Sequence, residues 1–192
     1  MPDPFALGLP TLRGDRVRLR PVTEADEADL LAVFGDGRHL RFWSHGPLDG
    51  LDAARAYRES IEAGMRDRSL FQWAITEAGD DRLVGTTTLA SWDRGNRRAE
   101  IGFIVRPEVQ RRGVASDAVR TALRFGFSEM GLHRVEADVD PENAGSIRLL
   151  ERLGFQREGH FHERWFTWFE AWKDSAMFGL LARDFVDRPP RG

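Results

Sequence analysis

The chain has 192 residues, with 28 basic and 31 acidic side chains and a formal net charge of −3. This length predicts about one domain that buries its own core, and the near-neutral charge argues against binding to nucleic acid, which needs concentrated positive charge. The absence of cysteine excludes disulfides, thiolate metal sites and a cysteine nucleophile. Tyr57 is the only tyrosine and Lys173 the only lysine.

Hydropathy periodicity and turn residues predict the order of elements along the chain. Residues 1–10 are expected to form an arm, 11–185 a single domain and 186–192 a tail. The pattern predicts helices after the Thr23 cap and at 51–65, 114–130 and 143–153. It predicts strands at 16–22, 71–77, 83–92, 98–105, 134–139, 155–166 and 172–181.

This order indicates the fold class. An antiparallel meander followed by strand–helix–strand–helix–strand is typical of an α/β domain with a mixed sheet. We expect about seven strands, mostly antiparallel, flanked by about four helices. No apolar stretch approaches the length needed to span a bilayer, and no secretory signal is seen, so we expect a cytoplasmic protein without a membrane partner.

The segment 104–118 is the most informative part of the sequence. A strand is expected to end at Pro107, and a turn then leads into a helix. Such a turn aims successive N–H groups and the positive end of the helix at one point, while Gly113 permits a positive φ and close approach. Two arginines add charge-assisted donors. This pattern predicts a pyrophosphate cradle, with an ordinary capped helix start as the alternative, formed by Gln110, Arg111, Arg112, Gly113, Val114 and Ala115.

Three motifs stand in the order found in a known family. The turn Gln110-x-x-Gly113-x-Ala115 resembles the coenzyme A signature of the GNAT N-acetyltransferase superfamily. The second motif is Arg82-Leu83-Val84-Gly85 with Ala99-Glu100-Ile101-Gly102. The third resembles the RimJ/RimL branch, the ribosomal-protein N-terminal acetyltransferase type, and consists of Asn143-x-x-Ser146 followed by Leu153-Gly154-Phe155-x-x-Glu158-Gly159. The resemblance covers residues 11 to 184.

The resemblance implies a GNAT fold and acetyl transfer from acetyl-coenzyme A to an amine, with no metal. In such enzymes the Glu100 strand and the strand beginning near Arg134 splay apart in a V-shaped gap that holds the pantetheine. Ile104 and Val105 would then bind the pantetheine through their backbone, residues 110–115 would bind the pyrophosphate, and Asn143 would bind the cofactor or cap its helix. Direct attack of the amine on the thioester agrees with the absence of cysteine.

The same resemblance suggests which residues catalyse the reaction. Glu100 is the candidate base that deprotonates the ammonium, directly or through a water, and an ion pair with Arg97 or Arg98 is the alternative interpretation. Ser146 would protonate or orient the leaving thiolate, or serve only as a capping hydroxyl. A backbone N–H near Ile104 is the expected oxyanion donor. Many family members use a tyrosine after this helix as the general acid. In this chain the aromatic residues of that region are all phenylalanine or tryptophan.

The acceptor side is less well defined by the sequence. His39, Arg41 and Trp43 lie between the first two helices, where this family usually builds its acceptor site, or they belong to a packed loop. His160 and His162 share one strand face, but no third ligand is near in sequence, so we do not expect a metal. The following aromatic residues form an acceptor wall or pack in a core or dimer interface: Trp165, Phe166, Trp168, Phe169 and Trp172.

The predicted function is transfer of acetyl from acetyl-coenzyme A to a primary amine, with the α-amine of a protein or peptide favoured as acceptor. A small amine, such as a polyamine, an aminoglycoside or an amino acid, is the first alternative. A non-catalytic acyl-coenzyme A sensor is the second, because the usual tyrosine acid is missing. The exposed aromatic strand also suggests a homodimer.

Overall fold

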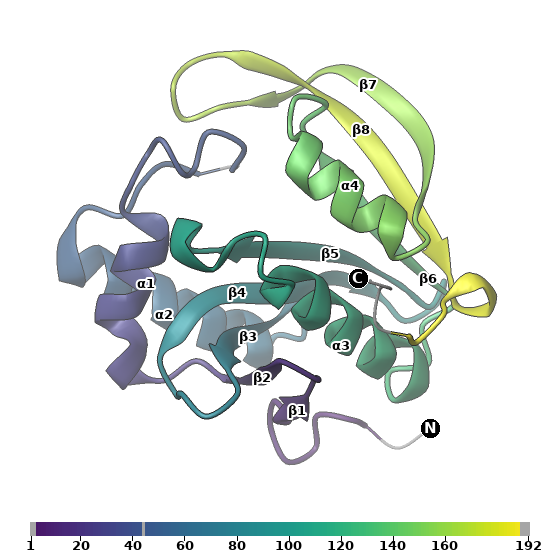
Figure 1. Ribbon diagram of the computed structural model, residues 1–192, viewed down its shortest axis with the longest axis horizontal. Coiled ribbons are helices and arrows are strands. Elements are labelled where there is room, and N and C mark those ends of the chain that lie inside the picture. The colour runs from purple at the N-terminus through teal and green to yellow at the C-terminus, as the bar shows by residue number, and fades with distance from the viewer. Residues whose placement is uncertain (1–2, 44, 189–192) are drawn as a thin grey trace.

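The computed structural model describes residues 3–43 and 45–188, which form a sheet of eight strands flanked by four helices (Figure 1). The spatial order of the strands is β1-β2-β3-β4-β5-β6-β8-β7. The helices are α1 (Glu27–Phe34), α2 (Gly50–Arg66), α3 (Val114–Ser128) and α4 (Ala144–Arg152). The strands are β1 (Leu12–Arg13), β2 (Val17–Pro21), β3 (Leu70–Glu77), β4 (Leu83–Asp93), β5 (Arg98–Val105), β6 (Arg134–Val139), β7 (Gln156–Phe166) and β8 (Trp172–Leu181).

The mixed α/β fold is confirmed, with one strand more than the sequence indicated. The extra strand is β1, in which Leu12 pairs with Leu19 of β2. The expected arm also packs on the domain, because Phe5 is only 2% exposed and stacks on Phe71 with ring centroids 4.0 Å apart. An isolated aromatic residue and a two-residue strand have no period to detect. Residues 1–2 of the arm and 189–192 of the tail lie outside the described residues.

Helices cover both faces of the sheet. On one face α1 and α2 pack against the sheet around Ala74 of β3, in a cluster that also contains Leu30 and Phe34. On the other face α3 contributes Leu123 to the larger cluster that contains Trp73. Trp73 and Ala74 are neighbours on β3 and enter different clusters, because successive side chains of a strand point to opposite faces.

Strands β5 and β6 separate halfway along their length. They are the parallel pair in the sheet, and their pairing ends at Glu100 opposite Glu136. Beyond this point β5 continues to Val105 between α3 and α4 (Figure 1). The second half of β5 therefore has β4 on one side and the expected V-shaped gap on the other. Glu100 lies at the vertex of that gap.

The hairpin of β7 and β8 arches over α4 at one edge of the sheet (Figure 1). Trp168 in its turn packs against Gly46 and donates its indole N–H to the carbonyl oxygen of Leu40 at 3.4 Å. The tip of the hairpin is thereby joined to the loop between α1 and α2. Among the described residues, none of the helices has the length and apolar character required to cross a membrane.

Candidate active site

A cavity of about 1130 Å³ lies where β5, the start of α3 and α4 meet. Its lining includes Ser146 and all of the predicted cofactor residues except Val114. The Val114 side chain is 2% exposed and packs in the core, so this residue can offer only its backbone N–H to the cavity. The residues that the sequence grouped by family motif are therefore brought together around one space.

The turn before α3 has the geometry of an anion site. Arg111 has a φ of 59° and Gly113, which caps α3, has a φ of 82°, so the chain twice enters the left-handed region before the helix begins. A Cβ on Gly113 would come no closer than 3.5 Å to its nearest neighbour, Arg16, so the cradle is open at this point. The first-turn N–H groups of α3 have no acceptor within the helix and can bind an anion.

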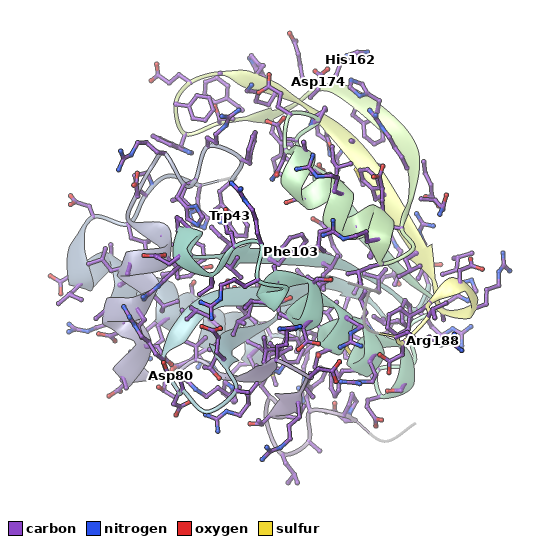
Figure 2. The ribbon with its side chains drawn as sticks, in the orientation of Figure 1. Trp43, Asp80, Phe103, His162, Asp174 and Arg188 are labelled. Atoms are coloured by element: carbon purple, nitrogen blue, oxygen red, sulfur yellow. The ribbon has the colours of Figure 1, made fainter. Side chains whose placement is uncertain are left out.

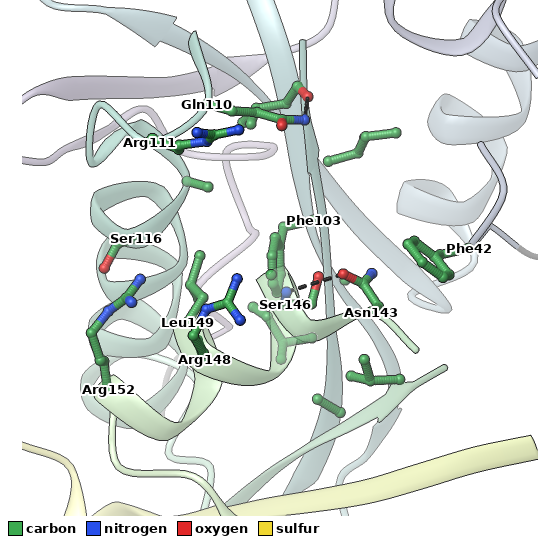
Figure 3. Close-up of a pocket in the computed structure, with 18 of the residues that line it drawn as sticks. Phe42, Phe103, Gln110, Arg111, Ser116, Asn143, Ser146, Arg148, Leu149 and Arg152 are labelled. Atoms are coloured by element: carbon green, nitrogen blue, oxygen red, sulfur yellow. Dashed lines mark hydrogen bonds between the residues drawn. The ribbon is translucent and has the colours of Figure 1, made fainter. Parts of the chain in front are cut away.

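Unpaired cations complete this anion site. Within the described part of the chain Arg111, Arg148 and Arg152 line the cavity without forming a salt bridge, whereas Arg112 pairs with Glu77 at 2.8 Å. The Ser116 hydroxyl also lines the cavity and is buried without a partner among the described residues. Figure 3 shows Arg152 pointing from α4 toward Ser116 of α3, with Arg148 on the same helix extending into the space near Phe103. This donor set fits a ligand with several phosphates, such as coenzyme A.

Arg148 and Arg152 were not predicted from the sequence, although a signal for them exists. They are four residues apart and so lie on one face of α4, next to the predicted Asn143 and Ser146. Which face of α4 meets the cavity is decided by the packing of Leu149 and Leu150 against the core. Without that packing, two arginines at helical spacing indicate only a solvated face.

The register of β5 changes one prediction about the backbone. The Arg106 N–H donates to the Val84 carbonyl at 2.8 Å, and Ile104 pairs with Thr86. Backbone groups alternate between the two sides of a strand, so those of Ile104 face β4, whereas those of Phe103 and Val105 face the gap. We therefore transfer the predicted contacts of Ile104 with pantetheine and the oxyanion to Phe103 and Val105.

Asn143 and Ser146 take distinct roles at the start of α4. The Ser146 N–H donates to the Asn143 side-chain oxygen at 3.1 Å, which makes Asn143 the cap (Figure 3). The capping oxygen is thus supplied by Asn143, and the Ser146 hydroxyl is not needed for the cap. Ser146 lines the larger cavity, where it stays the candidate for protonating a leaving thiolate.

A second cavity of about 390 Å³ adjoins the first and is lined by Glu100. The two cavities share Ile101 and Gly102 of β5, the residues directly after the vertex of the gap. Four acidic residues and five aromatic residues line the second cavity: Glu100, Asp138, Asp140, Asp174, Phe42, Trp43, Tyr57, Trp165 and Phe166. Carboxylates beside aromatic faces attract an ammonium group. We call this space the acceptor cavity.

The surroundings of Glu100 favour a base over a structural ion pair. Of the two expected partners, Arg98 instead donates to Glu136 at 2.9 Å, and among the described residues neither Arg97 nor Arg98 forms a salt bridge with Glu100. Burial raises the pKa of Glu100 above its ordinary value, and the nearby carboxylate of Asp138 raises it further, while the Arg164 guanidinium lowers it. A raised pKa brings the carboxyl group closer to the pKa of an amine and so makes it a better proton acceptor.

Asp138 of β6 is the main residue of this site that sequence analysis missed. Its side chain is 5% exposed and lines both cavities. Arg164 and Trp165 donate to one carboxylate oxygen at 2.8 and 3.1 Å, and the Ser175 hydroxyl donates to the other. The donors come from β7 and β8, so no local pattern around Asp138 indicates this network.

These charges predict how the activity depends on pH. We expect the acid limb of kcat/KM to have its midpoint above the ordinary carboxyl range, because the Glu100 pKa is raised. Asp138→Asn removes a negative neighbour and shifts the midpoint down, whereas Arg164→Gln removes a positive neighbour and shifts it up. The midpoints are obtained from kcat/KM measured between pH 4 and 9. All three proteins are measured with the same acceptor, so that titration of the acceptor amine affects each profile equally. Equal midpoints in the three proteins would contradict the assignment.

The remaining predicted acceptor residues divide between the two cavities. Arg41 and Trp43 line both, whereas His39 lines only the larger one. Tyr57 reaches the acceptor cavity from α2, where burial raises its pKa to about 12 and its hydroxyl accepts from the Gln72 amide at 3.1 Å. Tyr57 does not line the larger cavity, so it does not replace the missing tyrosine acid.

The aromatic residues of the β7–β8 hairpin lie in three different environments. Trp165 and Phe166 line the acceptor cavity, as an acceptor wall requires. Trp168 packs on the loop between α1 and α2, and Phe169 meets Trp168 edge to face with ring centroids 5.2 Å apart. Trp172 is 58% exposed and contacts Phe166.

The chain is similar in sequence to a known protein family. Residues 16–156 match the family model described as an acetyltransferase (GNAT) domain. The chain is 32% identical over 150 residues to the uncharacterized N-acetyltransferase YoaA of Bacillus subtilis, covering 78% of this chain and 85% of YoaA. It is 27% identical over 151 residues to spermidine N(1)-acetyltransferase of Escherichia coli, covering 78% of each chain.

A solved structure shows the same fold. Mycobacterium smegmatis RimJ, in complex with CoA-disulfide, superimposes with a TM-score of 0.84 at 26% identity, covering 91% of this chain and 88% of that one. The chain belongs to the GNAT family and is an N-acetyltransferase.

Proposed function

We propose that this enzyme transfers acetyl from acetyl-coenzyme A directly to the α-amine of a protein or peptide, as the RimJ/RimL branch does. The observation that carries the proposal is the meeting of the two cavities at Ile101 and Gly102, directly after Glu100. A thioester in the larger cavity and an amine in the acceptor cavity then face one another across the vertex of the gap. The two reactants are positioned without a protein nucleophile.

The residues of the site account for each step. Glu100, directly or through a water, takes a proton from the acceptor ammonium, and the neutral amine attacks the thioester carbonyl. The oxyanion accepts a hydrogen bond from a gap-facing N–H of Phe103 or Val105. Collapse of the tetrahedral intermediate breaks the C–S bond and releases the coenzyme thiolate. The nitrogen of the intermediate gives up its second proton as the amide forms, and the thiolate takes up one proton, relayed by the Ser146 hydroxyl, which ends unchanged, or by water.

A peptide acceptor is favoured by the edge of β6. Beyond Glu136 this strand pairs with β8 on one side only, and its other side borders the gap. With the pantetheine held on the β5 side of the gap by Phe103 and Val105, an extended peptide in the acceptor cavity can pair its backbone with the opposite, β6 edge. A polyamine has no backbone amide groups with which to do so. The location of the enzyme in the cytoplasm and its assembly as a homodimer stay predictions from the sequence.

A polyamine is the second candidate acceptor. The carboxylates of Glu100, Asp138 and Asp140 exceed what one ammonium needs and suit a ligand with several positive charges, whereas the Asp174 carboxylate is bonded to His160 and His162. The similarity to a spermidine N(1)-acetyltransferase supports the same candidate.

One experiment separates the two acceptors. The enzyme is incubated with labelled acetyl-coenzyme A and the peptide and small-amine fractions of a bacterial extract, and mass spectrometry locates the label. We expect labelled protein N-termini, and a kcat/KM for a matching peptide that exceeds that for spermidine. Blocking the peptide's α-amine should abolish its labelling. A larger kcat/KM for spermidine would assign the polyamine function instead.

A further inference from the structure

Two histidines and an aspartate gather on the outer edge of the β7–β8 hairpin. His160 and His162 lie on β7 and Asp174 lies on β8, and one ligating atom from each residue falls within 4.8 Å of the others. His160 Nε2 is 2.8 Å and His162 Nδ1 is 3.1 Å from the same carboxylate oxygen of Asp174. Figure 2 shows His162 and Asp174 next to each other on the outside of the molecule. The third ligand that the sequence did not reveal is therefore supplied by the neighbouring strand.

The hairpin holds these three side chains on one face. His160 pairs in register with Ala176, and Asp174 is two residues from Ala176, so the two side chains point to the same side. His162 follows His160 by two residues and joins them. The other carboxylate oxygen of Asp174 accepts the Glu163 N–H at 2.9 Å, where β7 is irregular and Glu163 has a φ of 48°. Asp174 is thereby oriented before any ligand arrives.

We propose that His160, His162 and Asp174 form a binding site for a divalent transition-metal ion of the zinc type. Imidazole nitrogens with one carboxylate are a ligand set that Zn²⁺ prefers, and three protein ligands leave a fourth position open. Ligand atoms about 2.0–2.1 Å from the ion at tetrahedral angles are about 3.3 Å apart. The two histidine–aspartate separations of 2.8 and 3.1 Å need to open by only a few tenths of an ångström to admit the ion, and the two histidine nitrogens lie within 4.8 Å of one another.

The neighbouring Arg157 side chain is positively charged and disfavours binding of the ion. An Arg157 N–H lies 3.0 Å from His160 Nδ1 and donates to it, which leaves the imidazole proton on Nε2. Coordination through Nε2 moves that proton to Nδ1 and turns the exposed Arg157 side chain toward solvent. Arg164, the next basic residue on β7, is held by Asp138 instead. Arg157 therefore lowers the affinity of the site, and its removal should raise it.

The position of the site gives the ion an effect on the fold. It would join β7 to β8 across the irregular part of their register, between Phe161 and Trp165. Trp165 and Phe166, a few residues further on, line the acceptor cavity. The ion would stabilise the part of the hairpin that carries this wall of the cavity.

Zn²⁺ titration of tag-free, chelator-treated enzyme by calorimetry tests the site, with Co²⁺ absorption as a second readout. We expect one ion per chain, a higher Tm with Zn²⁺, and a tetrahedral Co²⁺ spectrum. Loss of an outer-shell partner already weakens metal binding by about 10–100-fold, so His162→Ala and Asp174→Asn should each weaken it at least about tenfold. Arg157→Ala should strengthen it.

We expect both His162→Ala and Asp174→Asn to fold, so that a loss of binding reports on the metal ligands. The His162 side chain is 83% exposed, and Asp174→Asn retains the oxygen that accepts the Glu163 N–H. His133→Ala is the matched control, because His133 is also exposed but lies outside the cluster, and it should bind Zn²⁺ as the unchanged enzyme does. Absence of saturable binding below about 1 mM, or undiminished binding in His162→Ala and Asp174→Asn, would overturn the proposal. Acetyl transfer is not part of the readout.

Discussion

Replacing Glu100 by glutamine is expected to lower kcat by about 100-fold, the low end of what loss of a general base costs. The amide keeps the shape of the side chain and cannot accept the ammonium proton. The affinity for coenzyme A should stay unchanged, because Glu100 lines the acceptor cavity and not the larger one. The acid limb of the pH–rate profile should also disappear, since the group that causes it no longer titrates.

Stability provides an independent check on Glu100→Gln. The pKa of Glu100 is higher in the folded protein than in the unfolded chain. At a pH above both of these pKa values the carboxylate is charged in both states, and its charge destabilises the folded state relative to the unfolded one. The variant should therefore unfold at the same or a higher temperature than the unchanged enzyme at neutral pH. A fall in both activity and Tm would indicate damage to the fold instead.

Glu136→Gln is the matched control for this variant. Glu136 stands opposite Glu100 in the parallel register, but its carboxylate is paired with Arg98 and Arg134 and lines neither cavity. Its loss should change kcat far less than loss of Glu100. Similar losses in the two variants, or an unchanged pH–rate profile in Glu100→Gln, would remove Glu100 as the base.

Gly113→Trp is expected to abolish detectable binding of coenzyme A, with a loss of roughly 100-fold or more. The indole would fill the space in front of the first-turn N–H groups of α3. Loss of two charge-assisted hydrogen bonds, at about 1.5–3 kcal/mol each, accounts for this magnitude. Calorimetric titration with coenzyme A measures the affinity, and circular dichroism reports whether the variant is folded.

Two further variants separate blocking of the cradle from backbone strain. Gly79→Trp places the same side chain at a glycine with a φ of 90° and open space around its Cβ, away from both cavities. It should bind coenzyme A normally. Gly113→Ala carries the strain of a positive φ with little bulk and should lose much less affinity. Normal affinity in folded Gly113→Trp would refute the assignment of the turn.

Much of the coenzyme site could be predicted because it is local in sequence. The turn at 110–115 and the cap at Asn143 and Ser146 each lie within six residues, and their backbone geometry follows from their own side chains. Hydropathy alternation likewise indicates strands wherever one face is buried. β1 and the packing of Phe5 escaped prediction because each depends on a partner far along the chain.

The acceptor side could be predicted only in part. Arg41 and Trp43 were expected there and line the acceptor cavity, yet the carboxylate of Asp138 and the hydroxyl of Tyr57 were not expected. These groups meet from β6 and α2, and no motif links the two elements. Charge and burial of this kind arise only when distant strands and helices close around one space.

The sequence by itself determined the family, the order of most elements and the absence of a cysteine nucleophile, and it predicted the turn at 110–115 as a phosphate site. Tertiary structure alone decided that β5 and β6 part after Glu100, that Phe103 and Val105 face the gap, and that the lone tyrosine lies on the acceptor side. It also joined Asp174 to two histidines across a hairpin. The division has one physical reason: local geometry follows from neighbouring residues, whereas register, burial and charge depend on which segments pack together.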